Sequence, residues 1–348
     1  MNKAAPPLSI TSARYRIRRV SAGTREDHDF IQVPHLVYPD QREYGQKATR
    51  PALHLNPERY LMMRGKHPIG RFALYRNEGL HYRGQTAVLL GSYECINDPG
   101  AHEALLGFAV RIARQRSADW LIGPVEGSIW ERYRFRTTDA NPLFLLEPGQ
   151  DPSYPGYWEK YGFHPIMDYL TNVDETLSYD DGQLDRMWRR YVDRGAVIRP
   201  FDKSRAEEEL VRLARLSNIA FAGSFLFTPI TVEDFVSKYK RILPMMDARF
   251  VWLVEGQDKR LEAFLFAIPD LYDREGRTLL IKSMAVRPDS SYRGIATWLA
   301  RHLNRVATSA GYARILHALM RRDNLSVNAS LRYTKQCYAE YSLYGMKL

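Results

Sequence analysis

Cysteine is nearly absent from this chain of 348 residues, in which Cys95 and Cys337 are the only two. Two thiols so far apart cannot build a disulfide framework or, by themselves, a structural metal site, and they suit a reducing compartment. The sequence also lacks the HxxxH and CxxC spacings of metal sites, so we expect no metal. No G-x-S-x-G elbow occurs, which argues against a serine hydrolase.

Long apolar runs are missing as well. No stretch approaches 18 apolar residues, which excludes a membrane-spanning helix, and the first residues (MNKAAPPLSITSARYRIRR) contain no apolar signal core. We therefore expect a cytoplasmic protein without a membrane partner. The content of 45% hydrophobic and 26% charged residues is typical of a globular protein, and the length suits two domains.

The formal net charge is +10, and the basic residues are spread along the chain. An excess of Arg suits an anionic ligand such as coenzyme A, an acidic carrier protein or nucleic acid. A solvated basic surface explains it equally well. Because no basic tail is present, we do not expect a nucleic-acid partner.

The segment from Thr278 to Gly311 carries the clearest functional pattern. A strand-like run from Thr278 to Val286 leads into a short polar loop, and Arg293-Gly294-Ile295-Ala296 then opens a helix. That helix has apolar residues at offsets 0, 3, 4, 8 and 11: Ile295, Trp298, Leu299, Leu303 and Val306. A glycine-bearing loop before a helix N-terminus predicts an anion site, because the first helical amides lack internal partners. An ordinary strand-loop-helix crossover without a ligand is the alternative.

The loop is neither a Walker loop nor a dinucleotide fingerprint, because it lacks Gly-Lys-Ser/Thr and the three-glycine spacing. The residues Ser291-Tyr292-Arg293-Gly294-Ile295-Ala296 resemble the acyl-CoA pyrophosphate loop of the GNAT superfamily of N-acetyltransferases, written Arg/Gln-x-x-Gly-x-Gly/Ala. Gly294 and Ala296 match that pattern. Ser291 stands where it has Arg or Gln.

The order of expected elements extends the resemblance. Residues 185–348 follow the GNAT order β-α-α-β-β-β-α-β-α-β, and the first half resembles the same fold more loosely, without the loop signature at 96–102. The resemblance implies an α/β fold (an α+β mixed sheet flanked by helices) of two tandem GNAT-like domains. These are a degenerate N-terminal domain (1–178) and an acyl-CoA-binding C-terminal domain (179–348) with splayed central parallel strands.

Three expected elements close the two halves. A strand from Met167 to Val173 ends the first half. In the second half we expect a helix from Asp323 to Tyr333 and a last strand from Tyr341 to Met346.

The resemblance implies a set of residues for acyl-CoA. Backbone groups of Met284, Ala285 and Val286 would pair with the pantetheine arm, as a strand edge does. The amides from Arg293 to Ala296 (Arg293, Gly294, Ile295 and Ala296) would hold the pyrophosphate, helped by the Thr297 hydroxyl. Arg287 and Arg293 would supply positive charge. For Arg287, an ordinary charge at the surface end of the strand is an equally good interpretation.

Asn324 matches the family's asparagine that bonds the pantetheine arm, and it would also serve as a helix N-cap. Seven residues further on, the family usually has a tyrosine that protonates the departing thiolate. Leu331 stands there in this sequence, so the identity of the general acid stays open.

His317 interrupts an apolar strand, and Ser283 lies at the matching depth of the neighbouring strand. A neutral imidazole beside a hydroxyl could act as a general base or polarise a thioester carbonyl. A satisfied core histidine is the alternative. The pair also resembles the hydroxyl residue and histidine of GNAT-like loading domains, which decarboxylate malonyl-CoA and pass acetyl to a carrier protein.

In the first half, aromatic and arginine residues alternate in the segment 125–135 (VEGSIWERYRF). They could line an acceptor pocket, stack bases or form a half-buried interface, and we favour the pocket wall or the interface.

The function expected from these observations is acetyl transfer from acetyl-CoA, or another acyl-CoA, to a small-molecule amine by direct attack. A malonyl-CoA decarboxylase that loads an acyl carrier protein is the second hypothesis. A non-catalytic protein that binds acyl-CoA or nucleic acid is the third.

Overall fold

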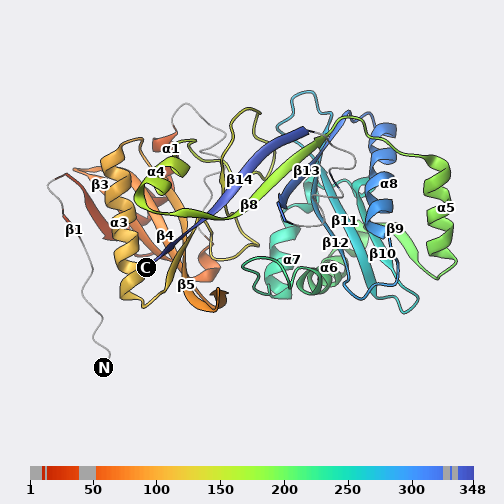
Figure 1. Cartoon of the computed structure of the whole chain (residues 1–348), viewed down its shortest axis with the longest axis horizontal. Coiled ribbons are helices and arrows are strands. Elements are labelled where there is room, and N and C mark those ends of the chain that lie inside the picture. Colours follow the sequence, from red (N-terminus) through yellow and green to blue (C-terminus); the bar gives the residue numbers. More distant parts are fainter. Residues whose placement is uncertain (1–9, 12–13, 39–51, 324–329, 331–335) are drawn as a thin grey trace. The chain divides into compact units, whose positions relative to one another are not determined.

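The computed structural model describes residues 10–11, 14–38, 52–323, 330 and 336–348, and these residues form two compact units. Unit 1 comprises Met1–Asp139, Pro148–Asp168 and Tyr341–Leu348, and unit 2 comprises Ala140–Glu147 and Tyr169–Glu340. Figure 1 shows the elements of both. Among the described residues, every helix is too short or too polar to cross a lipid bilayer.

Unit 1 is a mixed sheet with three helices among its described residues. Its strand order is β1-β2-β3-β4-β5-β6-β14, in which β5 and β6 run parallel and the other described pairs run antiparallel. The elements are β1 (Ile10–Thr11), β2 (Arg16–Arg19), α1 (Arg25–Val37), η1 (Leu53–Leu55), β3 (Glu58–Arg64), β4 (His67–Tyr82), β5 (Gln85–Cys95), α3 (Pro99–Gln115), β6 (Trp120–Gly123), β7 (Phe135–Arg136) and α4 (Tyr154–Tyr161).

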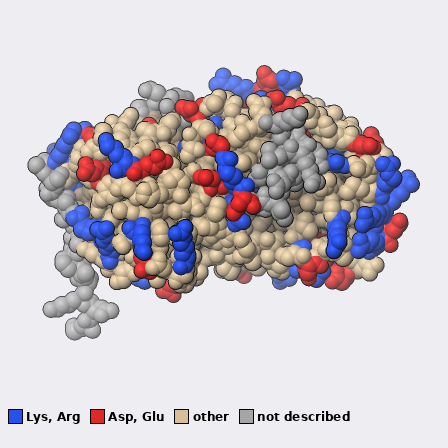
Figure 2. All heavy atoms as spheres, viewed as in Figure 1, with Lys and Arg blue, Asp and Glu red and all other residues tan. Residues whose placement is uncertain are grey.

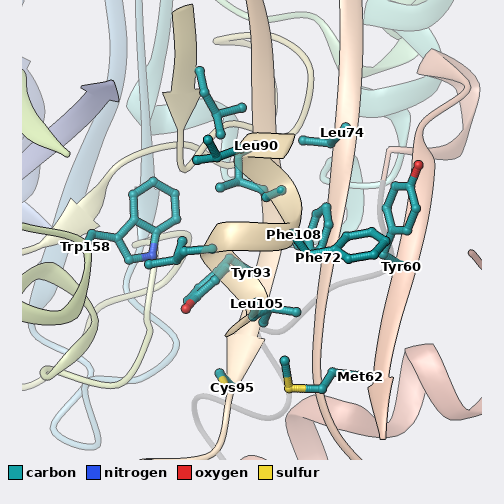
Figure 3. Packing of buried hydrophobic residues seen from close by; sticks show 14 of the residues in the cluster. Tyr60, Met62, Phe72, Leu74, Leu90, Tyr93, Cys95, Leu105, Phe108 and Trp158 are labelled. Carbon is teal, nitrogen blue, oxygen red and sulfur yellow. The ribbon is translucent and has the colours of Figure 1, made fainter. Parts of the chain in front are cut away.

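Aromatic side chains fill the core of unit 1 (Figure 3). Tyr60 on β3 stacks on Phe72 of β4 with ring centroids 4.9 Å apart, and Phe108 of α3 lies 5.4 Å from Tyr60. Trp158 of α4 packs edge-on against Phe135 at 4.9 Å. Each of these large side chains contributes roughly 1.5–3 kcal/mol by leaving water, so α3 and α4 are held firmly to the sheet.

Unit 2 has the strand order β8-β13-β12-β11-β10-β9, and β12 and β13 are its parallel pair. Its elements are α5 (Asp181–Val192), β9 (Val197–Pro200), η2 (Lys203–Arg205), α6 (Ala206–Ala220), α7 (Val232–Lys240), η3 (Leu243–Met245), η4 (Ala248–Phe250), β10 (Val251–Glu255), β11 (Leu261–Pro269), β12 (Thr278–Val286), α8 (Ile295–Ser309) and β13 (Arg314–Arg321). The strands β8 (His164–Asp174) and β14 (Gln336–Lys347) have residues in both units.

The apolar face expected of the helix after Gly294 is the buried face of α8. Ile295, Trp298, Leu299 and Leu303 are buried against the sheet of unit 2, where β11 contributes Ala263, Leu265 and Ala267. The helix α6 also packs on β11 and β12 but shares no residue with this cluster, so it covers the other face. Helices therefore flank a mixed sheet, as the sequence predicts.

Two of the expected strands pair with strands from the other half of the sequence. The last strand exists, but its residues from Tyr344 to Lys347 pair with β6 of unit 1. The strand expected at Met167 to Val173 is β8, and its residues from Tyr169 to Asp174 pair with β13 of unit 2. Local patterning predicts a strand and not its partner. The predicted division of the chain into two GNAT-like domains, 1–178 and 179–348, stays a prediction.

Each unit buries a histidine on the helix that packs against its sheet. His102 of α3 shares a 2.7 Å hydrogen bond with the Tyr93 hydroxyl, and burial lowers its pKa to about 4. His302 of α8 stacks on Trp298 at 4.6 Å, and burial, with the charge of Arg305, lowers its pKa to about 4. Both imidazoles are therefore neutral at pH 7.

We expect the free energy of unfolding to fall as the pH decreases from 6.5 to 4. Both histidines have folded pKa values of about 4, below the 6.5 of the unfolded chain, so within this window the unfolded state binds more protons. The loss should be on the order of 2–3 kcal/mol per histidine, measured by urea unfolding at several pH values. The variant His302→Gln should show a shallower pH dependence, and identical slopes would contradict this assignment.

Candidate functional site

The parallel strands β12 and β13 of unit 2 are joined over only part of their length. Four residue pairs connect them, from Thr278 with Arg314 to Ile281 with His317. Beyond these pairs β12 continues to Val286 and β13 to Arg321, but the two strands no longer pair with each other. The strands thus separate halfway, which confirms the predicted splay.

A bulge on each strand begins where the pairing ends. On β12 the register with β11 skips Lys282, directly after the last pair with β13. On β13 the register with β8 skips Ala318 and Leu319, and Leu319 has a φ of 60°. Its amide donates to the Thr171 hydroxyl at 3.1 Å. Because a bulge bends and twists its strand, the two bulges explain why β12 and β13 diverge at this point.

The separation leaves a strand edge open. Residues of β12 from Met284 to Val286 pair with Ala263 to Leu265 of β11 on one side and, among the described residues, with no strand on the other. Ser283 and Met284 are half-buried, as are the residues of β13 from Ala318 to Arg321. The edge can therefore accept an extended ligand that pairs like a strand.

The loop that follows β12 is held in place by its neighbours. The Arg287 amide donates to the Glu262 carbonyl at 2.8 Å, which continues the pairing with β11. The Tyr191 hydroxyl of α5 donates to the Arg293 carbonyl at 3.1 Å, and the Tyr292 hydroxyl donates to the Arg194 carbonyl at 3.2 Å. The loop before α8 is thus fixed from both sides.

Gly294 is the N-cap of α8 and has a φ of 82°, a left-handed conformation that favours glycine. It provides no side-chain cap. In the described part of the chain, no group accepts from the amides of Gly294, Ala296 and Thr297. Unpartnered amides and the positive end of the helix dipole together favour an anion here.

Two of the loop amides predicted to bind the pyrophosphate have partners within the loop in the structure. The Arg293 amide donates to the Ser291 carbonyl at 3.1 Å, and the Ile295 amide donates to the Tyr292 carbonyl at 3.2 Å. These two amides donate to carbonyl groups of the same loop, because the loop forms tight turns there. The Arg293 side chain is exposed, and Arg287 donates through Nε to the Leu261 carbonyl at 3.3 Å.

The corresponding helix N-terminus in unit 1 is already occupied by a carboxylate. Asp98 caps α3 and accepts from the amides of Gly100 at 3.0 Å and Ala101 at 3.3 Å. Burial alone would raise the pKa of Asp98. Hydrogen bonds from Tyr15 and the backbone, together with nearby arginine charge, have the larger combined effect, so the pKa is lowered overall. An anion supplied by the chain itself therefore fills this position.

The gap beside β5 in unit 1 is also filled. Only three residue pairs join β5 to β6, and the chain then returns across the gap with the Val125 amide donating to the Leu90 carbonyl at 2.9 Å. A Cβ on Gly91 would lie 2.5 Å from the Val125 carbonyl oxygen. The Glu126 carboxylate accepts from the amide and hydroxyl of Ser92. In the segment 125–135, residues 125–128, 134 and 135 are buried in unit 1, and residues 129–133 are half-buried.

His317 and Ser283, the expected catalytic pair, are not joined by a hydrogen bond. His317 Nδ1 lies 2.9 Å from the Ser330 hydroxyl, which also accepts from the Asn172 side chain at 3.1 Å. Burial lowers the pKa of His317 to about 4. Sequence reasoning missed Asn172 and Ser330, because Asn172 belongs to the first half of the chain and no local pattern marks either residue.

Asn324 and Leu331 lie outside the described residues. Among the residues that are described, no group of three or more His, Cys, Asp or Glu side chains could hold a metal ion.

Comparisons with known proteins agree with this geometry. No family model matches the sequence. The chain is 26% identical over 239 residues to the bacterial ceramide synthase of Caulobacter vibrioides (65% of this chain, 60% of that protein). It is 23% identical over 261 residues to protein YghO of Escherichia coli (70% of this chain, 65% of that protein). It thus spans less than two thirds of the length of these curated relatives.

Solved structures share the fold of both halves. A GCN5-related N-acetyltransferase from Sphaerobacter thermophilus has a TM-score of 0.53 at 13% identity, over 97% of each chain. A tandem GNAT protein from the clavulanic acid biosynthesis pathway has a TM-score of 0.53 at 13% identity, over 96% of this chain and 98% of that one. The glucosamine N-acetyltransferase region of a fungal multi-domain β-N-acetylglucosaminidase has a TM-score of 0.59 at 12% identity, over 98% of this chain and 38% of that one. With its order of elements and its separated parallel strands, the chain has the tandem GNAT fold that the sequence predicts.

Proposed function

We propose that the protein is an acyl-CoA-dependent N-acyltransferase with one acyl-CoA site, which lies in unit 2. The observation that carries the proposal is that a free strand edge and an uncapped helix N-terminus lie on consecutive elements. The strands β12 and β13 open a free strand edge, and the loop after β12 leads to the uncapped N-terminus of α8. An extended arm that ends in a diphosphate matches both features.

Each part of the donor has residues suited to it. The diphosphate accepts from the amides of Gly294, Ala296 and Thr297, and Arg293 adds positive charge. The pantetheine arm pairs with β12 from Met284 to Val286. Its thioester then lies where β12 and β13 part, close to the end of the ladder at Ile281 and His317.

The chemistry needs little beyond this positioning. The amine nitrogen attacks the thioester carbonyl carbon, a C–N bond forms, the C–S bond breaks, and the amine proton leaves with the thiolate. His317 is neutral at pH 7, and a pKa of about 4 makes it a weak base toward an ammonium group. The amine must therefore arrive deprotonated, and His317 serves to order the strand through Ser330 and Asn172.

The donor and acceptor that the sequence predicts are acetyl-CoA and a small amine. The relative named bacterial ceramide synthase favours a second pair, a longer acyl-CoA and a long-chain amino alcohol, because ceramide is an N-acylated amino alcohol. Both combinations of acyl donor and amine acceptor would form an amide by the same step. Decarboxylation of malonyl-CoA for a carrier protein has less support, since His317 bonds Ser330 and not Ser283.

The proposal predicts that coenzyme A thiol is released from an acyl-CoA only when an amine is supplied. We expect release from acetyl-CoA or palmitoyl-CoA to rise with pH toward the pKa of the amine, as the deprotonated acceptor accumulates. A thiol-trapping assay with ethanolamine and with a long-chain 2-amino alcohol measures it and separates the two pairs. Carbon dioxide release from malonyl-CoA without amine would contradict the proposal.

Replacing Gly294 tests the anion site directly. The variant Gly294→Asp should place a carboxylate over the α8 amides, as Asp98 does for α3, and raise the KM for acyl-CoA by more than about tenfold. Gly294→Asn is the matched control, because it bears the same strain, about 1 kcal/mol at this φ, without the charge. Equal effects of the two variants would show that charge at this position does not matter.

In unit 1 the helix N-terminus and the gap beside β5 are filled by the chain itself, which predicts how many coenzyme A molecules the protein binds. Because Asp98 and Glu126 already occupy them, we expect one coenzyme A per chain by isothermal titration calorimetry. Binding of two molecules, or binding that survives Gly294→Asp unchanged, would place a site elsewhere.

A further inference from the structure

The helix α5 borders the loop before α8. Its Tyr191 hydroxyl holds the Arg293 carbonyl at 3.1 Å, and a Cβ on Gly294 would lie 3.3 Å from that hydroxyl and 3.8 Å from the Met187 methyl group. At its other end the Leu184 carbonyl accepts from the Trp298 indole at 3.0 Å. The C-terminal end of α5 is thus fixed beside the N-terminus of α8.

The charges of α5 are divided between its two ends. Asp181 and Asp185, in the first half of the helix, lie 3.4 Å and 3.5 Å from Arg305. Arg190, near the other end, and Arg194, in the turn just after the helix, are exposed and form no ion pair with any described residue. Figure 2 shows Lys and Arg side chains gathered over the surface where Figure 1 draws α5.

Arg190 and Arg194 lie on either side of Tyr191 in the chain, and the Tyr191 hydroxyl holds the loop at the Arg293 carbonyl. The charges of both act on the Tyr191 hydroxyl and lower its pKa, although burial is the larger effect and raises it. The Arg194 guanidinium lies 5.7 Å from the centre of the Tyr292 ring. Arg293, in the loop itself, also lacks an acidic partner among the described residues.

Some exposed arginines of unit 2 have acidic partners, and others, such as Arg186 and Arg189, form no ion pair with a described residue. Arg249 lies 2.7 Å from Asp247, Arg277 lies 2.6 Å from Glu275, and Arg205 pairs with Glu208. Three like charges without a counter-ion repel one another, so the group at Arg190, Arg194 and Arg293 favours a multiply charged anion.

We infer that Arg190 and Arg194 form a second phosphate subsite, which binds the 3′-phosphate of coenzyme A beside the diphosphate. The inference rests on the proposed function, because it assigns a further group of the same donor. Coenzyme A carries a phosphomonoester on the ribose next to its diphosphate, so two anionic groups arrive together. The loop before α8 provides amides for the diphosphate, and Arg190 of α5 and Arg194 of the turn after it supply guanidinium groups for the other phosphate.

The test compares coenzyme A with dephospho-coenzyme A, which lacks only the 3′-phosphate. Calorimetry at about 0.1 M salt gives both dissociation constants for the native protein and for Arg190→Ala/Arg194→Ala. We expect the native protein to prefer coenzyme A by about tenfold or more, and the double variant to lose that preference while its affinity for dephospho-coenzyme A changes less than about threefold. Arg189→Ala, an exposed arginine of the same helix, is the matched control and should behave as the native protein.

Two results would overturn the subsite. An equal loss for both ligands would mean that the arginines act only as general charge on the diphosphate. No loss for either, with the melting temperature alone reduced, would limit them to offsetting the α5 dipole. In both cases the proposed function stands if Gly294→Asp still weakens coenzyme A binding by more than about tenfold. If the native protein binds neither ligand, the proposed function fails and the subsite with it. If the Ala double variant does not fold, Arg190→Gln/Arg194→Gln replaces it.

Discussion

The early end of the β12–β13 ladder is the constraint on which the candidate site depends. Parallel strands that kept pairing would bury their backbone groups and leave no edge for a ligand. Here the register skips Lys282 on one strand and Ala318 and Leu319 on the other, directly after the last pair. The bulges direct the strands apart, and α8 begins within one short loop of the opened edge.

The two units solve the same physical problem in different ways. A helix N-terminus and a gap between parallel strands both leave backbone groups that need partners. Unit 1 satisfies them with its own Asp98 and with the segment around Glu126. Unit 2 leaves Gly294 without a side chain over the α8 amides. This contrast between the two units is the reason for proposing a single acyl-CoA site, in unit 2.

The sequence predicted much of unit 2 because its signals are local. The apolar spacing after Gly294 predicted the buried face of α8. The positive φ of Gly294 follows from the same kind of signal.

Features that depend on distant residues could not be predicted. The partner of His317 is Ser330, oriented by Asn172 from a strand in the other half of the sequence. The pairing of the last strand with β6 is equally nonlocal, because alternation of side chains does not encode which edge a strand joins. The loop amides that turn inward, such as that of Ile295, depend on backbone geometry that the residue types do not specify.

A crystal structure of the protein with bound coenzyme A tests the central claim most directly. We expect the diphosphate oxygens within hydrogen-bond distance of the amides of Gly294, Ala296 and Thr297. The pantetheine arm should run along β12 from Met284 to Val286, with its sulfur where β12 and β13 part. Coenzyme A bound beside β5 in unit 1, or a diphosphate held away from the N-terminus of α8, would contradict this account.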